Sequence, residues 1–135
     1  MNKLKASLLT AAFLAMAGVS NAEVVVVVSA KNPASSMTAA QVADIYLGKD
    51  SSLAPLDLPE ASSERGQFYN KVAGKDTAQV KAIWARLVFT GKSQPPKEVS
   101  GSAEAVKLVA TSEKGIAYVD KSAVDGSVKV VLSVQ

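Results

Sequence analysis

The sequence is 135 residues long, carries a formal net charge of +3, and contains neither cysteine nor histidine. Without cysteine there is no disulfide, no thiolate nucleophile and no zinc–cysteine site. Without histidine the chain lacks the usual general base and the commonest transition-metal ligand, which excludes the Ser–His–Asp class of enzyme. The carboxylates, Asp57 and Glu98 among them, are scattered along the chain. We therefore expect them at the surface, and we expect neither enzymatic activity nor a bound cofactor or metal.

Residues 1–22 have the pattern of a secretory signal peptide. Two lysines precede an apolar run over 6–19, and the small-x-small triplet Ser20-Asn21-Ala22 follows. The apolar run is too short for a comfortable membrane span, although an uncleaved anchor is the alternative. We expect cleavage after residue 22 and export to the periplasm, which leaves 23–135 as one small domain that is not embedded in a membrane.

The predicted mature chain is close to neutral. Loss of the two lysines of the signal peptide from 15 Lys and Arg residues, against 12 Asp and Glu residues, leaves a net charge of +1. Charges of both signs are interspersed along the chain, which does not fit a nucleic-acid-binding protein.

The first half of this domain predicts a strand, a helix and a second strand. The valine run 24–28 predicts an interior strand covered on both faces, with an exposed edge strand as the alternative. A capping box that begins at Thr38, and a stop at Gly48, predict a helix over 39–47. A short strand is expected at 54–58.

Three further helices are predicted in the middle of the chain. Behind 62–65, apolar residues at helical spacing predict a helix that ends at Val72 or Ala73. A capping box at Asp76 begins the strongest helical pattern, which ends before Gly91. Ser102 is expected to cap a helix that continues through residue 109.

Two aromatic residues belong to the strongest helical pattern. Trp84 lies on its apolar face and Phe89 lies at its end. We interpret both as core residues rather than as a platform on which a ligand stacks.

Two strands, 115–119 and 127–134, complete the chain. In the second strand we expect one face to carry Val128, Val130, Leu132 and Val134. The order β-α-β-α-α-α-β-β predicts the α/β class: a single small domain with a mixed β-sheet flanked by helices.

The stretch PEASSERGQF (59–68) is the one candidate binding site. Ser62 and Ser63 supply hydroxyl donors at a predicted helix start, and Arg65 supplies a planar fork of N–H donors that suits a tetrahedral oxyanion. The alternative is that Ser62 only caps the helix while Arg65 is solvated. Glu64 favours that alternative, because a carboxylate at the same helix end would repel an anion.

Four segments occur in an order that resembles a known family: MTAAQVADIYLGK, SSERGQFYNKVAG, IWARLVFTGKSQPP and KGIAYVDKSAV. Together they resemble the phosphate-binding proteins, which are the substrate-binding subunits of phosphate ABC transporters. The resemblance implies a PstS-like fold of the type 2 periplasmic-binding-protein kind. The mature chain is long enough for one of the two lobes of such a protein.

The resemblance also implies a site and partners. The family motif GSGTR-x-x-F places its serine on Ser62 and its arginine on Arg65, while Ser63 and Glu64 replace its glycine and threonine. The implied ligand is inorganic phosphate or a similar oxyanion. The implied partner is an inner-membrane ABC permease or another envelope protein, and a sensor role is equally open. The alternative is an envelope protein-interaction module that keeps the fold but has lost tight ligand binding.

Overall fold

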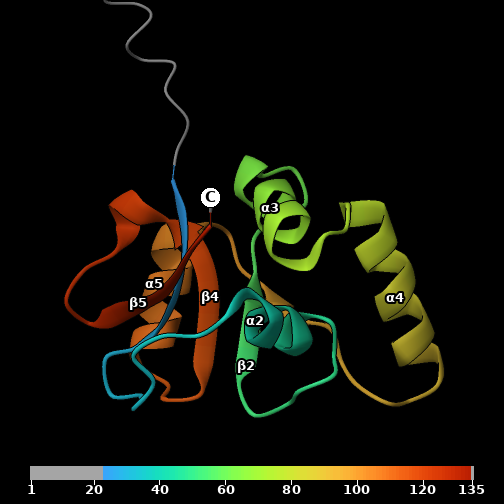
Figure 1. Ribbon diagram of the computed structural model, residues 1–135, viewed down its shortest axis with the longest axis horizontal. Coiled ribbons are helices and arrows are strands. Elements are labelled where there is room, and N and C mark those ends of the chain that lie inside the picture. Colours follow the sequence, from blue (N-terminus) through green and yellow to red (C-terminus); the bar gives the residue numbers. More distant parts are fainter. Residues whose placement is uncertain (1–22, 135) are drawn as a thin grey trace, which may run out of the picture.

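Five strands form one mixed sheet in the order β3-β2-β4-β1-β5 (Figure 1). The computed structural model describes residues 23–134, so the predicted signal peptide lies outside the described residues. The strands are β1 (Val24–Ser29), β2 (Ala54–Asp57), β3 (Lys97–Glu98), β4 (Gly115–Asp120) and β5 (Val128–Val134). Strand β2 is parallel to β3 and β4, whereas β1 is antiparallel to both of its neighbours. The predicted α/β fold with a mixed sheet is confirmed.

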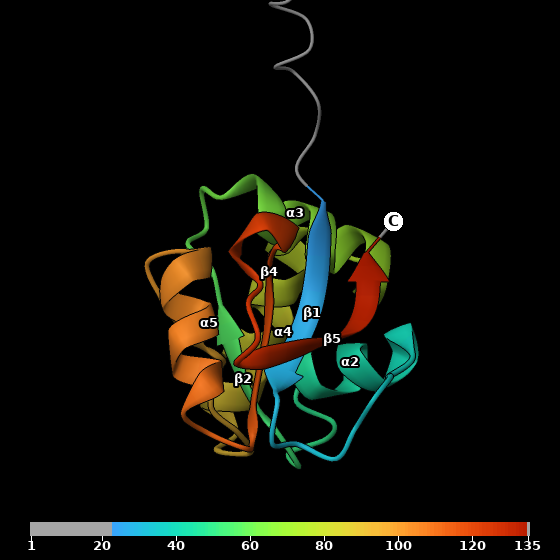
Figure 2. The same ribbon diagram turned by 90° about the vertical axis from the view of Figure 1, so that its left-hand side faces the viewer.

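Helices lie on both faces of this sheet. In Figure 2 the sheet stands between α5 on one side and α2 with α3 on the other. The helical elements are α2 (Ala39–Tyr46), α3 (Ser63–Phe68), the π-helical turn η2 (Tyr69–Ala73), α4 (Thr77–Phe89), α5 (Ser102–Ala110) and the 3₁₀ turn η3 (Lys121–Ala123). Among the described residues no helix has the length and apolar character needed to cross a membrane.

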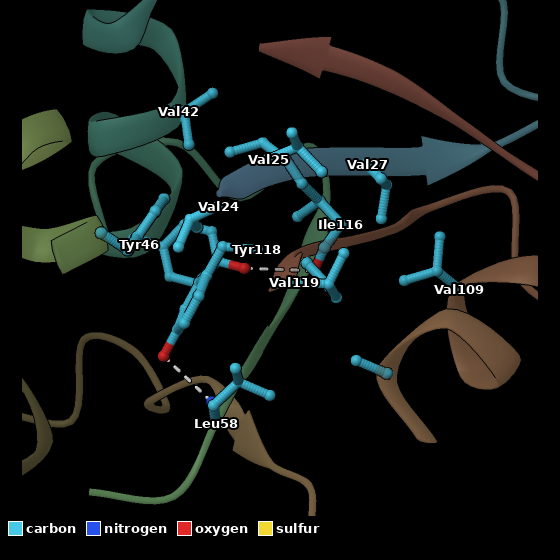
Figure 3. Packing of buried hydrophobic residues seen from close by; sticks show 14 of the residues in the cluster. Val24, Val25, Val27, Val42, Tyr46, Leu58, Val109, Ile116, Tyr118 and Val119 are labelled. Atoms are coloured by element: carbon cyan, nitrogen blue, oxygen red, sulfur yellow. Dashed lines mark hydrogen bonds between the residues drawn. The ribbon is translucent and has the colours of Figure 1, made fainter. Parts of the chain in front are cut away.

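The valine run occupies the interior of the sheet, as predicted. Val24–Val28 in β1 are at most 1% exposed, because β4 and β5 pair with both edges and helices cover both faces. Figure 3 shows Val24, Val25 and Val27 in one cluster with Ile116 and Val119 of β4 and with Val42 of α2. A run of five β-branched residues is therefore explained by burial on both faces.

Local signals set the helix ends correctly. Thr38 and Asp76 both form complete capping boxes at the starts of α2 and α4. Gly48, Gly74 and Gly91 follow their helices with φ values of 83°, 68° and 71°. This left-handed backbone favours glycine, because other residues place a Cβ against the carbonyl oxygen.

Two expectations about the second half of the chain are wrong. Ser102 is the first residue of α5 and not its cap, since Gly101 occupies the cap position and the Ser102 hydroxyl accepts the N–H of Asp120 at 2.9 Å. The short strand β3 was not predicted, because its two residues, Lys97 and Glu98, are charged and form a strand only by pairing with β2.

The last strand does not alternate as expected. The register of β5 against β1 shifts between Val26 and Val27, so that Val131 has no partner opposite it. Val131 is consequently buried, whereas Val130 is 37% exposed. A bulge of this kind inserts one residue and reverses the face of those beyond it. The predicted single apolar face of β5 is therefore wrong.

Candidate functional site

The candidate site begins where β2 ends. The chain leaves the sheet at Asp57 and enters α3 at Ser63 after a short loop (Figure 1). Ser62 caps α3, because its hydroxyl oxygen accepts the N–H of Arg65 at 3.3 Å. In α/β sheets the edge at the carboxyl ends of parallel strands is where ligands usually bind. The fold therefore brings the predicted serines and arginine to that edge.

The side chain of Arg65 turns back toward the end of β2. Its Nη1 donates to the carbonyl oxygen of Leu58 at 2.8 Å and lies 3.5 Å from a carboxylate oxygen of Glu98, while its Nη2 lies 3.8 Å from Asp57. The side chain is only 11% exposed. Its Nε is buried and has no hydrogen-bond partner among the described residues. A buried N–H donor without an acceptor is costly, so this arginine has unused capacity for an acceptor.

Asp57 is the charged centre of this region, and the expectation that it lies at the surface is wrong. Its side chain is buried and accepts hydrogen bonds from the hydroxyls of Tyr69, at 3.0 Å, and Tyr118. The Tyr118 hydroxyl in turn accepts the backbone N–H of Leu58 at 3.0 Å (Figure 3). Three separate elements, β2, η2 and β4, are thereby joined through one carboxylate.

Burial raises the pKa of Asp57 above its usual value, against the opposing effect of the tyrosine hydroxyls and Arg65. Burial also raises the pKa of Tyr69 and of Tyr118, and the nearby Asp57 charge acts in the same direction. The two hydroxyls consequently remain protonated donors at any physiological pH.

The aromatic rings around Asp57 pack against one another. Phe68 stacks on Tyr118 with ring centroids 4.2 Å apart, and Tyr46 meets the edge of Phe68 at 4.7 Å. The hydroxyl of Tyr46 donates to the carbonyl oxygen of Leu56 at 2.8 Å. The sequence analysis missed this cluster, because its members are spread from α2 to β4 and share no local spacing.

A groove of about 580 Å³ lies beside Arg65, between α4 and the edge of the sheet. Its polar residues are Asp57, Arg65, Lys81 and Glu98, and its remaining wall consists of Val80, Trp84, Ala85, Val88, Phe89, Pro95 and Pro96. Neither Ser62 nor Ser63 lines this groove. The structure therefore brings the three predicted anion-binding residues together on the backbone of α3, but it directs the guanidinium toward a groove that the serines do not reach.

The two aromatic residues of α4, Trp84 and Phe89, differ in burial. Trp84 is buried and donates its indole N–H to the carbonyl oxygen of Tyr46 at 2.9 Å, so its assignment to the core is confirmed. Phe89 is 90% exposed and its neighbour Val88 is 51% exposed, so the assignment of Phe89 to the core is wrong. Phe89 is the last residue of α4, where the helix extends beyond the sheet and no element covers it (Figure 1).

Within residues 23–134 no group of three or more Asp and Glu side chains is arranged to hold a metal ion. The carboxylates nearest to each other around Arg65 are Asp57 and Glu98, and both face its guanidinium.

Comparison with known proteins supports the fold and leaves the family unassigned. No family model matches the sequence, and no curated protein matches it. Solved structures do match, and each of those described below covers 82% of this chain. The fold that they share with it corresponds to one lobe of these proteins, and the chain spans less than half the length of each.

Three of the matching structures are phosphate-transport proteins by name. A protein from Clostridium perfringens, assigned to the phosphate ABC transporter substrate-binding proteins and holding bound phosphate, has a TM-score of 0.67 and 22% identity over 44% of its length. An ABC-type phosphate transport receptor from Vibrio cholerae has a TM-score of 0.62 and 18% identity over 45% of its length. PstS from Borrelia burgdorferi has a TM-score of 0.60 and 11% identity over 47% of its length. The chain therefore has a PstS-like fold, as the sequence motifs predicted.

Proposed function

We propose that this protein binds a small oxyanion, with inorganic phosphate as the first candidate, through Arg65. Ser62 and Ser63 would contact the same ion only if the guanidinium turned out of the groove toward the start of α3. The observation that carries the proposal is the position of α3, which starts at the carboxyl end of β2 in a fold shared with a phosphate-bound protein. The first N–H groups of a helix have no partner within the helix, and the helix dipole makes that end attractive to an anion.

The side chains at this helix start add suitable donors. The Ser62 oxygen accepts the N–H of Arg65, which leaves the hydroxyl proton free to donate to an anion. Ser63 is exposed in the first turn. Arg65 lies 3.5 and 3.8 Å from its two carboxylates, which is longer than the 2.7–2.9 Å of a strong charge-assisted hydrogen bond. Its Nη2 therefore retains the capacity to bind an oxyanion.

Three carboxylates oppose the anion. Asp57 and Glu98 face the guanidinium, and Glu64 stands in the first turn of α3. A single exposed helix end contributes only about 0.3–1 kcal/mol per charge. We therefore propose weak binding by the chain alone and stronger binding when a second surface closes over the site.

We propose that an envelope partner supplies that second surface. We propose export to the periplasm by the predicted signal peptide, 1–22, and delivery of the anion to an inner-membrane ABC permease or a signalling protein in the envelope. The signal peptide and the domain boundary at residue 23 remain predictions, which N-terminal sequencing of the exported protein would test.

Calorimetric titration of residues 23–135 with phosphate and with sulfate tests the binding proposal. We expect heat of binding with phosphate, loss of that heat in Arg65→Ala, and no change in Arg86→Ala, which alters an exposed arginine of α4 outside the groove. Glu64→Thr should tighten binding, because it removes a repelling charge and adds a hydroxyl donor. Absence of heat at millimolar phosphate, or equal binding by Arg65→Ala, would refute the proposal.

A second candidate function is an envelope protein-interaction module without tight ligand binding. The observation that favours it is the exposure of Val88 and Phe89, since adjacent exposed apolar side chains often mark an interface. Crosslinking in the periplasm tests this function. A defined crosslinked partner that Phe89→Ser abolishes would support it, whereas recovery of the monomer alone would count against it.

A further inference from the structure

The groove beside Arg65 is much larger and more apolar than a bare oxyanion requires. We propose that the ligand is an organic oxyanion, whose anionic group pairs with Arg65 and whose alkyl or aryl body occupies the groove. This inference rests on the proposed oxyanion-binding function and specifies the class of ligand. It differs from that function in giving the apolar part of the groove a role in affinity.

The dimensions and the lining of the groove fit this class. Its volume of about 580 Å³ lies within the range of small-molecule sites, which are mostly apolar with a few convergent polar groups. Its apolar lining includes Trp84, Val88 and Phe89 from α4 together with Pro95 and Pro96. These side chains offer no hydrogen bond to an inorganic ion, but they exclude water from a hydrocarbon body.

Arg65 is placed to hold the anionic end. It is the less exposed of the two cations that line the groove, with its side chain 11% exposed. Lys81, the other cation of the lining, is exposed and already pairs with Glu60 at 3.1 Å. The anionic group is therefore expected at Arg65 rather than at Lys81.

The two carboxylates beside Arg65 differ in how easily a ligand can displace them from the guanidinium. Asp57 is buried and held by two tyrosine hydroxyls, so it stays in place. The side chain of Glu98 is 59% exposed and lies 3.5 Å from Nη1, and an exposed ion pair of this kind contributes little. A ligand oxyanion can thus replace Glu98 at the guanidinium, and Glu98→Gln should tighten binding.

Fluorescence of Trp84, the only tryptophan in the chain, reports on the groove directly because this residue lines it. The chain is titrated with phenyl phosphate, inorganic phosphate and phenol. We expect phenyl phosphate to bind about tenfold more tightly than inorganic phosphate, because its ring is buried against apolar surface. Phe89→Ser should weaken phenyl phosphate several-fold and leave inorganic phosphate unchanged. The control Ala82→Ser, on the exposed part of α4 outside the groove, should change neither affinity.

The outcomes separate this inference from the proposed function. Inorganic phosphate that binds through Arg65 while phenyl phosphate binds no more tightly refutes the inference and leaves the function intact. Phenol that binds as tightly as phenyl phosphate also refutes it, because the anionic group would then contribute nothing. Failure of both phosphates to bind refutes the function and the inference together. Tighter binding of phenyl phosphate that requires both Arg65 and Phe89 supports both.

Discussion

Replacement of each of three buried tyrosines by phenylalanine, one at a time, should lower the free energy of unfolding by a different amount. Tyr46, Tyr69 and Tyr118 are all 0% exposed, so a change to phenylalanine removes the same atom from equally buried rings. Only the hydrogen-bond partners differ. The free energies of unfolding of the three variants consequently compare those partners with one another.

The partners give the expected order. Tyr46 donates to neutral backbone carbonyls, so Tyr46→Phe should cost about 1 kcal/mol. Tyr69 donates to the carboxylate of Asp57, so Tyr69→Phe should cost about 2 kcal/mol, the value typical of a bond to a charged group. Tyr118 donates to the same carboxylate and also accepts the N–H of Leu58. Its loss leaves two buried groups unsatisfied and should cost about 3 kcal/mol.

Urea unfolding monitored by the fluorescence of Trp84 measures these differences, since this single tryptophan is buried in the folded protein. Small single domains usually unfold in one cooperative step, which permits comparison of the midpoints at a constant slope. If Tyr46→Phe proved the most destabilising of the three, or if Tyr118→Phe cost no more than Tyr69→Phe, the hydrogen-bond network around Asp57 would not hold the fold together as described.

Three further predictions concern charge and backbone. The pKa of the Asp57 carboxyl is raised in the folded protein, so the folded state binds the carboxyl proton more tightly than the unfolded chain does. The contribution of Asp57 to the free energy of unfolding therefore falls as pH rises from 3.8 through the folded pKa. Asp57→Asn should therefore gain stability relative to the parent as pH rises over that window, and a pH-independent difference would contradict this. Gly48→Ala should destabilise the fold by more than about 2 kcal/mol, because its Cβ would lie 2.8 Å from Leu87 Cδ1. Gly74 also has a positive φ, but a Cβ there would meet no atom within 4 Å, so Gly74→Ala should cost only about 1–2 kcal/mol in thermal unfolding. Asp76→Ala should cost about 1 kcal/mol by loss of the helix cap, and an unchanged urea midpoint would refute the role of this cap.

The sequence predicts those features that neighbouring residues determine. Thr38 caps a helix through the residue three positions later, and Gly48 ends it by its own backbone conformation. The valines of β1 indicate an interior strand, because an exposed strand of this composition would be prone to aggregation. These local patterns, with the ordered family motifs, suffice for the fold.

What the sequence does not predict depends on distant residues. Asp57 resembles any surface carboxylate until Tyr118, sixty-one positions away, donates to it. The bulge at Val131 arises from the pairing of β5 with β1, and no turn or glycine marks it. The candidate site shows both cases. Ser62 caps its helix as local chemistry predicts, while the inward turn of Arg65 is held by a hydrogen bond to Leu58 and an ion pair with Asp57, seven and eight positions earlier in the chain.

The central place of β1 has a consequence for how the chain folds. The first strand of the domain lies between the last two, β4 and β5, so its hydrogen bonds join residues about one hundred positions apart. Such long-range pairing slows folding, because the entropy of closing a large loop is lost before the contacts form. The backbone hydrogen bonds of β1 cannot form on either edge until β4 and β5 are available to pair with it. The order of its strands therefore predicts that the sheet assembles late in folding, after β4 and β5 have been brought to β1.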